Sequence, residues 1–450
     1  VNLTYSGTAT NNTDYSSANS ITISAGSLTG TTSVTAQDDS VAEGTETIII
    51  DIGTVSGASE DGTQQVTISL LDNESSNVTG VISSDTTWTV ANSPYTISGN
   101  VNVVSGVTLT VDPGVTVNFN SGFYLQIEGT LSAVGTVSDS IVFTGTNWKG
   151  IDIQTAGSTI KYARINGATN GNYSVKFIGS EVSNSHIYDS RGVYLTNNST
   201  FNKNKVHDIT YSFLSLSSSS DTDTSTVYGN EFYNPLQGSS INLSGRSNTN
   251  TSFLVFSNNS VVVPASYSSG LLFISGKVTF EKNIITQLAG SNNNTNSYGI
   301  YLGRSYDNVY PVVRYNNIGG FGTNVKLRGA KPTSFSNNNF TGTLDVSSQK
   351  NVTVQDDGYP SSQVAINMQS NYWGNVPASD IPNSIYDWDD DFSVKGDIDY
   401  TNALTAPDPT APISAPSSVT KYADGNNIKF NWAANKETDV AGYQLHYGTT

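Results

Sequence analysis

Three groups of carboxylate side chains near the start of the chain are candidates to bind a metal ion. Each group falls where a short β-type run is expected to end, and the groups are Asp14, then Asp38, Asp39 and Glu43, then Asp72 and Glu74. Carboxylates gathered at loop tips repel one another, and a hard cation such as calcium, with about 6 to 8 oxygen ligands, removes that repulsion. The spacing alone is equally typical of solvated turn residues, so both interpretations stay open.

Two cations further along the chain form a second candidate site. In the run from 324 to 329, alternation places the apolar residues inward and both Lys326 and Arg328 on one outer face. Arg304 and Arg314 precede this pair and are candidates to join it. Because guanidinium groups bind carboxylates as a bidentate fork, such a group is suited to clamp an acidic glycan. The alternative is a set of solvated cations that balance an acidic surface.

Other residues of catalytic type have no partners that the sequence identifies. The Asp pairs at 356–357 and within 389–391 match glycoside hydrolases by residue type alone, and the second run is better explained as an end-cap or a calcium loop. His186 and His207 lie one repeat apart and are candidates to stack. The sequence places no carboxylate or nucleophile beside them, so we interpret them as residues of the fold. No phosphate-binding glycine loop and no zinc-ligand spacing occurs.

A recurring phrase, asparagine followed two residues later by an apolar residue, indicates the architecture that positions these groups. The phrase returns at irregular intervals of about 20 to 30 residues, which is the signature of a solenoid built from short strands. Its asparagines are Asn204, Asn230, Asn259, Asn283, Asn316, Asn338 and Asn371. Stacked coils would place them above one another, so we predict an asparagine ladder in the turns of a right-handed parallel β-helix.

Composition narrows the classes of function. The chain has 450 residues, of which only 13% are charged, with a net charge of −17. An acidic chain repels phosphate backbones and anionic lipids, so nucleic acid is an unfavourable partner. There is no cysteine, and no apolar run is long enough to span a bilayer. Because the chain lacks an initiator Met and stops in mid-pattern at Thr450, we expect it to be an internal fragment of a larger modular protein.

The first segment, residues 1–74, resembles a Calx-beta domain. The motifs that carry this resemblance are the runs at 7–10, 14–15, 21–27, 38–46, 66–68 and 72–74. The resemblance implies an immunoglobulin-like sandwich that binds calcium at one end. The ligands it implies are Asp14, Asp38, Asp39, Glu43, Asp72 and Glu74, with the carbonyl of Val41 as a further candidate. Asn73 stands where the family often has Asp, and the family's first strands are missing before Val1, which together weaken the site.

The long middle of the chain resembles secreted proteins with the pectate-lyase-like β-helix fold. The opening run from 105 to 119, the run Trp148–Lys149–Gly150–Ile151 and the ending run from 370 to 375 carry the likeness. This fold hosts lyases, hydrolases, adhesins and inert stalks, so the likeness implies an architecture and leaves the activity open. Lyases of this fold need a base beside a group that neutralises the sugar carboxylate, for which Lys326 and Arg328 are the candidates.

The end of the chain resembles the first strands of a fibronectin type III domain, through Trp432 and the run from 437 to 443. The expected organisation is all-β, with a β-helix flanked by two partial sandwiches. Its parts are a Calx-beta domain at 1–74, a linker at 75–98, the β-helix at 99–400, a proline-rich linker at 401–417 and a partial fibronectin type III domain at 418–450.

These features together predict a secreted or cell-surface modular protein that resembles bacterial surface proteins. The first interpretation is a calcium-binding adhesion, glycan-interaction or stalk module, and the corresponding partners are calcium and extracellular or cell-surface glycans. The alternative is a lyase or glycoside hydrolase that degrades acidic polysaccharide at the outer face of the β-helix. An enzyme predicts a base and a cation together on that face, an adhesin predicts rows of exposed aromatic rings, and a spacer predicts neither.

Overall fold

The structure is a computed structural model of the whole chain, and it describes most of its residues. Those that it does not describe are 40–42, 63, 72–75, 219–221, 237–238, 246–253, 289–295, 304–309, 343, 356–358, 360–361, 414–416, 425–426, 434–439, 441 and 444–450. Among the predicted site residues, Val41, Asp72, Glu74 and Arg304 therefore lie outside the described part, as does the pair at 356–357.

The first segment forms two small antiparallel sheets. The larger has the order β1 (Asn2–Gly7), β4 (Glu46–Thr54) and β5 (Gln65–Leu70), and the smaller pairs β2 (Tyr15–Ser17) with β3 (Val34–Ala36). Ala9, Tyr15 and Ile48 form its small buried cluster. This arrangement agrees with the predicted antiparallel strands, while the Calx-beta assignment itself stays a prediction.

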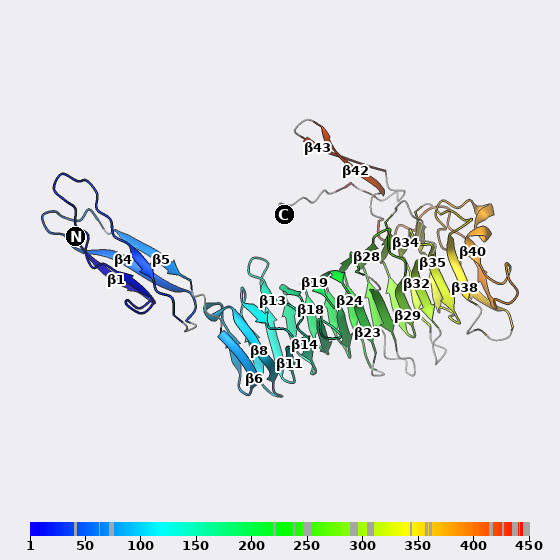
Figure 1. The fold of residues 1–450 in the computed structure, drawn as a ribbon. Helices are drawn as coiled ribbons and strands as arrows, with labels where there is room; N and C mark the ends of the chain where they lie inside the picture. The colour runs from blue at the N-terminus through cyan, green and yellow to red at the C-terminus, as the bar shows by residue number, and fades with distance from the viewer. Residues whose placement is uncertain are drawn as a thin grey trace.

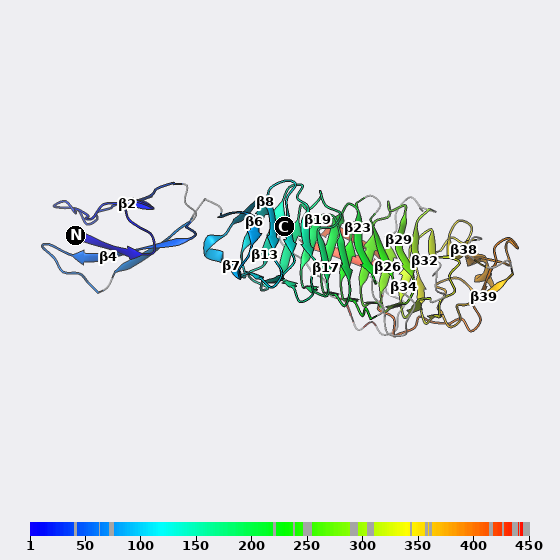
Figure 2. The same ribbon diagram turned by 90° about the horizontal axis from the view of Figure 1, so that it is seen from below.

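A right-handed parallel β-helix follows, and its strands stack along the long axis of the molecule (Figures 1 and 2). Each coil contributes one strand to each of three parallel sheets, here named sheets 1, 2 and 3 in the order in which the chain meets them within a coil. Alternate residues point inward in almost every strand, as in Thr108–Val111, where Leu109 and Val111 are buried and the threonines face outward. The inward residues form one continuous apolar core along the helix.

The strands of sheet 1 are β7 (Thr86–Trp88), β9 (Thr108–Val111), β12 (Thr130–Val134), β15 (Thr159–Lys161), β18 (Glu181–Ser183), β21 (Thr200–Asn202), β24 (Thr226–Tyr228), β27 (Leu254–Ser257), β30 (Val278–Glu281), β33 (Val312–Arg314) and β36 (Ser334–Ser336). Those of sheet 2 are the first half of β8 (Tyr95–Val103), then β10 (Thr116–Phe119), β13 (Ile141–Gly145), β16 (Ala163–Asn166), β19 (His186–Ser190), β22 (Lys205–Ile209), β25 (Glu231–Tyr233), β28 (Ser260–Val263), β31 (Ile284–Gln287), β34 (Asn317–Gly319) and β37 (Asn339–Thr341). Those of sheet 3 are the second half of β8, then β11 (Tyr124–Ile127), β14 (Gly150–Ile153), β17 (Val175–Ile178), β20 (Val193–Thr196), β23 (Ser212–Ser217), β26 (Ser240–Ser244), β29 (Gly270–Ser275), β32 (Tyr298–Gly303), β35 (Thr323–Arg328), β38 (Lys350–Gln355) and β40 (Ile385–Tyr386).

The β-helix begins earlier than the sequence predicted. Strand β6 (Ser76–Ile82) pairs in parallel with β8, and β7 pairs with β9, with a short 3-10 turn η1 (Val90–Asn92) between β7 and β8. The segment 75–98, predicted as a linker, therefore contributes a first coil. The segment was predicted as a linker because it is rich in polar residues. An end coil packs against a neighbouring coil on one side only, so it needs few apolar residues.

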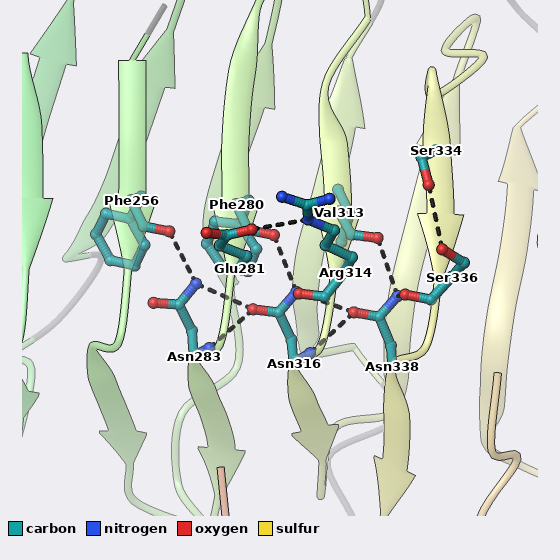
Figure 3. Close-up of polar contacts among 10 residues, drawn as sticks. All are labelled: Phe256, Phe280, Glu281, Asn283, Val313, Arg314, Asn316, Ser334, Ser336 and Asn338. Atoms are coloured by element: carbon teal, nitrogen blue, oxygen red, sulfur yellow. Dashed lines mark hydrogen bonds and ion pairs between the residues drawn. The ribbon is translucent and has the colours of Figure 1, made fainter. Parts of the chain in front are cut away.

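The predicted asparagine ladder is present between sheets 1 and 2. In the part shown in Figure 3, the side-chain amide of Asn283 donates to Oδ1 of Asn316 at 3.0 Å and to the carbonyl of Phe256 at 3.0 Å. Asn316 repeats both bonds one coil later, to Asn338 at 2.9 Å and to the carbonyl of Phe280 at 3.0 Å. The amide side chains thus satisfy backbone groups that the turn leaves unpaired in the buried interior.

The left-handed backbone of these turns lies one residue before each ladder asparagine of Figure 3. Lys282, Tyr315 and Asn337, which precede the ladder asparagines, have φ values of 56°, 57° and 57°. None of the ladder asparagines is among the described residues whose φ is positive. Asparagine is therefore required at these positions for its hydrogen bonds, while the preceding residue makes the sharp turn.

The far end of the β-helix is closed by short elements. Strands β39 (Val364–Asn367) and β41 (Gly396–Asp399) pair in parallel beside the 3-10 turns η2 (Ala378–Asp380) and η3 (Pro382–Ser384). The chain then returns along sheet 2, where Asp408 accepts a hydrogen bond from Asn337 at 2.7 Å. The segment predicted as a proline-rich linker, 401–417, therefore packs against the β-helix over part of its length.

After this segment, β42 (Ser417–Asp424) and β43 (Asn427–Ala433) form an antiparallel hairpin. Strand β43 contains Trp432, which carries part of the fibronectin type III resemblance, while most of the run from 437 to 443 lies outside the described residues. Among the helices that the structure describes, all of them short 3-10 turns, none has the length and apolar character to cross a membrane.

Candidate functional site

The first predicted site, the carboxylate group of the N-terminal segment, is assembled in part. Asp14, Asp39 and Glu43 offer carboxylate oxygens that all lie within 4.8 Å of one another. Asp14 is only 5% exposed. One of its oxygens accepts the backbone N–H of Thr10, and the other is buried with no hydrogen-bond partner among the described residues. Asp38 is described but does not join this group.

A buried carboxylate oxygen without a partner is unfavourable unless a cation or proton compensates it. Three acidic side chains converging on one point are the oxygen ligands that calcium prefers. Asp14, Asp39 and Glu43, three of the ligands that the resemblance implies, therefore form a candidate calcium site.

The second predicted site lies on the outer face of sheet 3. Lys326 points outward from β35 as predicted, and it stands in register between Tyr301 of β32 and Thr353 of β38. Arg328 lies two residues further on the same strand and is exposed. Arg314 does not join them, because it belongs to sheet 1, where its Nε lies 2.7 Å from Glu281 (Figure 3).

The third set of predicted residues, the acidic run at 389–391 near the end of the β-helix, lies in a turn that side-chain hydrogen bonds stabilise. Asp387 is buried and accepts the backbone N–H groups of Ile398 at 2.7 Å and Asp389 at 3.2 Å. Asp391 accepts the N–H of Ser393 at 2.8 Å and the hydroxyl of Tyr386 at 3.1 Å. These bonds are those of a turn, and Asp387, Asp389 and Asp397 also offer carboxylate oxygens within 4.8 Å of one another, so the predicted alternatives of an end-cap and a calcium loop both stay open.

A fourth group, which the sequence analysis set aside, lies on the outer face of sheet 2 and is named here the histidine cluster. Its side chains form two neighbouring columns, in which successive residues come from successive coils about 4.8 Å apart. One column is Arg164, His186, Lys205 and Glu231, and the other is Asn166, Tyr188, His207 and Tyr233. The two columns place imidazole, phenol and guanidinium groups side by side.

Asp208 orients the histidines of this cluster. Its Oδ2 lies 2.6 Å from Nδ1 of His207, and Asn234 donates to its other oxygen. A carboxylate at this position fixes His207 with its proton on Nδ1 and its lone pair on Nε2. Nε2 of His207 in turn contacts Nε2 of His186. His186 then carries its proton on Nε2, which leaves the lone pair on its Nδ1.

The surroundings keep His186 neutral at ordinary pH. Burial, the neighbouring His207 and then the cations Arg164 and Lys205 lower the pKa of His186 to about 4. Because the imidazolium form is disfavoured there, His186 holds a lone pair over the whole neutral range. No hydrogen bond to its Nδ1 occurs among the described residues, so this atom is the free base of the cluster.

Two tyrosines enclose the second histidine. The rings of Tyr188 and Tyr233 stack on His207, with ring centroids 5.5 Å and 4.5 Å away and interplanar angles of 11° and 15°. The hydroxyl of Tyr188 accepts a hydrogen bond from Asn166 at 3.0 Å, so its own proton is available for donation.

The interpretation that no carboxylate lies beside the histidines was therefore wrong. Two signals in the sequence point to the cluster: His186 and His207 are 21 residues apart, which is one coil, and Asp208 directly follows His207. The inference failed because it left Asp208 out of account. Its φ of 53° places it at a turn, but its carboxylate faces the imidazole of the preceding residue.

The chain resembles known proteins in its fold alone. No protein-family model matches the chain, and no curated protein matches it. Similar solved structures include the periplasmic alginate epimerase AlgG, with 12% identity, a TM-score of 0.31 and coverage of 68% of this chain and 78% of that one. An alginate lyase from Paenibacillus sp. str. FPU-7 has 15% identity, a TM-score of 0.28 and coverage of 63% and 91%. A PL6 alginate lyase in complex with a trisaccharide has 13% identity, a TM-score of 0.27 and coverage of 80% and 86%.

These structures correct the first functional interpretation. Each is named as an enzyme of a polysaccharide, which contradicts the interpretation as an adhesion, glycan-interaction or stalk module and agrees better with the alternative of a polysaccharide-degrading enzyme. The likeness at these identities is one of fold, so an activity has to be argued from the chain's own residues.

Proposed function

We propose that this chain is a polysaccharide lyase that acts on an acidic polysaccharide, with its reaction centre at the histidine cluster. The observation that carries the proposal is the aligned set Asp208, His207 and His186, which ends in a free imidazole nitrogen beside Arg164 and Tyr188. It joins a base, a cation and a proton donor on one outer face, which is the combination that distinguishes an enzyme from a spacer.

The cluster accounts for an elimination in which every proton has a destination. Arg164 pairs with the carboxylate of a uronate unit, which makes the neighbouring C5 proton easier to remove. Nδ1 of His186 takes that proton and passes its own Nε2 proton to His207, so that the positive charge rests beside Asp208. The C5–H electrons form the C4=C5 double bond, the C4–O4 bond breaks, and O4 receives the hydroxyl proton of Tyr188.

The products are one chain end with a double bond and one ordinary chain end, and neither water nor a redox partner is consumed. His207 then returns the proton to Nε2 of His186, the Nδ1 proton of His186 passes to solvent, and solvent returns a proton to Tyr188, so that every group regains its starting state. Because the substrate class is polymeric and acidic, the proposal includes an extracellular location and an extracellular polysaccharide as partner.

The direct test is incubation of the whole chain with alginate, polygalacturonate and hyaluronan, and with neutral dextran as the control. We expect at least one acidic polymer to give chain ends whose double bond is conjugated with the carboxylate and absorbs in the ultraviolet. Dextran should give none, because it has no carboxylate to acidify a neighbouring proton. Failure of all the acidic polymers, or release of saturated ends alone, would overturn the proposal.

A separate observation supports a proposal of calcium binding by the N-terminal segment. The partnerless, buried oxygen of Asp14 lies within 4.8 Å of ligand atoms of Asp39 and Glu43. Calcium that binds only the folded state stabilises it by mass action. This ion would hold the loops of the small sheets and takes no part in the elimination.

We predict that millimolar calcium raises the unfolding temperature of this segment, and that Asp14→Asn abolishes the increase. The substitution removes the buried charge that the ion would neutralise. Calorimetry with calcium, with magnesium and with a chelator checks the prediction. Asp61→Asn, at an exposed carboxylate of the same segment, is the matched control and should keep the response. An unchanged unfolding temperature in the parent chain would sink the calcium proposal.

A further inference from the structure

A group of aromatic rings around Lys326 on the outer face of sheet 3, named here the lysine platform, is separate from the histidine cluster. Phe273, Tyr298 and Tyr301 are mutually in contact, with ring centroids 5.5 to 6.0 Å apart. Nζ of Lys326 lies 5.2 Å from the centroid of the Tyr298 ring. The platform therefore combines a broad aromatic surface with a positive charge at its edge.

The backbone underneath is adapted to this arrangement. Gly270 lies in register with Tyr298, and a Cβ atom placed on it would come within 2.0 Å of the Tyr298 ring. The absence of a side chain at Gly270 thus lets the ring lie against the sheet. Burial, followed by the effect of Tyr301, raises the pKa of Tyr298, so its hydroxyl stays protonated and can act as a hydrogen-bond donor.

An open hollow of about 430 Å³ continues from Lys326 toward the end of the β-helix. Its lining combines the ammonium group with hydroxyl, amide and carboxylate groups, among them Thr353, Gln355, Tyr386, Asp391 and Ser393. Hydrogen bonds from Ser393 and Tyr386 lower the pKa of Asp391, which therefore stays a charged acceptor. Such a volume accommodates a small polar group such as a sugar ring, and its lining offers both donors and acceptors.

We propose that the lysine platform is a second, non-catalytic binding surface for an acidic polysaccharide. Sugar rings stack on Tyr298 and Tyr301, a carboxylate of the same chain pairs with Lys326, and the next ring enters the hollow. The residues that line the hollow include no histidine, and Lys326, which the sequence offered as a candidate base, is assigned here the role of pairing with a carboxylate of the polymer. It retains the polymer on one outer face while a different stretch of polymer reacts at sheet 2. The identity of the polymer rests on the proposed function.

The test measures binding in a background without turnover. His186→Ala is combined with Lys326→Ala and Tyr301→Ala, and the affinity for alginate and for polygalacturonate is measured by electrophoresis through gels that contain each polymer. Loss of one stacking and one charged contact is expected to weaken binding at least about tenfold. Lys176→Ala in the same background is the matched control, because Lys176 is an outward cation of sheet 3 on β17, far from β35 along the β-helix, and it pairs with Asp152 at 3.2 Å.

The outcomes separate this inference from the proposed function. The inference is supported if the platform substitutions weaken binding to the polymer in the gel and Lys176→Ala leaves that binding unchanged. The inference is overturned if the platform variant and its His186→Ala parent bind the polymer equally well, even when the native chain gives unsaturated products. If the native chain gives such products and the platform substitutions alone abolish them on short oligosaccharides, the platform is the reaction centre and the inference is wrong.

Discussion

Replacement of His186 by alanine is expected to lower kcat on an acidic polysaccharide by about 10²- to 10⁴-fold, the usual contribution of a positioned base. His186 supplies the free Nδ1 of the histidine cluster, which takes the C5 proton in the proposed elimination. Initial rates of double-bond formation measure the effect. Ser260→Ala is the matched control, because Ser260 occupies the same outer column beyond Lys205 and Glu231.

Asp208→Asn should also lower kcat, although it leaves the base in place. The substituted amide removes the charge that stabilises the imidazolium form of His207 and permits the wrong tautomer. The pH profile separates this positioning role from a structural one. In the parent chain, kcat/KM should fall as the pH is lowered through about 4, where His186 becomes protonated. Full activity of His186→Ala, with an unchanged profile, would exclude the cluster as the reaction centre.

The second large effect concerns stability and follows from the asparagine ladder. We expect Asn316→Ala to destabilise the β-helix by about 2 to 5 kcal/mol, because each buried polar group left without a partner costs about 1 to 3 kcal/mol. Asn316 is fully buried, donates to the carbonyl of Phe280, and accepts from the N–H of Asn283 at 2.9 Å. Its removal leaves both of these backbone groups without their present partner.

Denaturant unfolding followed by circular dichroism measures this loss. Asn118→Ala is the control, since Asn118 lies on the outer face of β10 and outside the ladder. A surface substitution of this kind changes stability by about 0.5 kcal/mol or less. Equal unfolding midpoints for Asn316→Ala and Asn118→Ala would show that the ladder contributes little to stability.

The sequence was sufficient for the architecture because the architecture depends on short-range patterns. Alternation identified the inward faces of strands such as β9, and the repeated asparagine identified the ladder from Asn204 to Asn371. Both patterns can be recognised in the sequence whatever the length of the loops between the strands. The first coil was missed because Thr86–Trp88 and its neighbours carry few apolar residues, as an end coil requires.

The site was harder to predict because it depends on which residues of different coils become neighbours. Alternation showed that Lys326 faces outward, but the ring of Tyr298 beneath its ammonium group comes from a coil separated by loops of unpredictable length. The same difficulty hid the histidine cluster, in which Arg164, His186 and His207 meet only through strand register. For Asp14 and Asp39, spacing alone could not show that the two carboxylates meet, and their ligand atoms lie within 4.8 Å of each other.

The most direct test of the account is a kinetic isotope effect on an oligouronate that carries deuterium at C5. The account predicts that the native chain forms the unsaturated product more slowly from the deuterated substrate than from the ordinary one in competition, because His186 breaks the C5–H bond. Equal rates accompanied by saturated chain ends would contradict it, since they would show that the glycosidic bond is cleaved without removal of that proton.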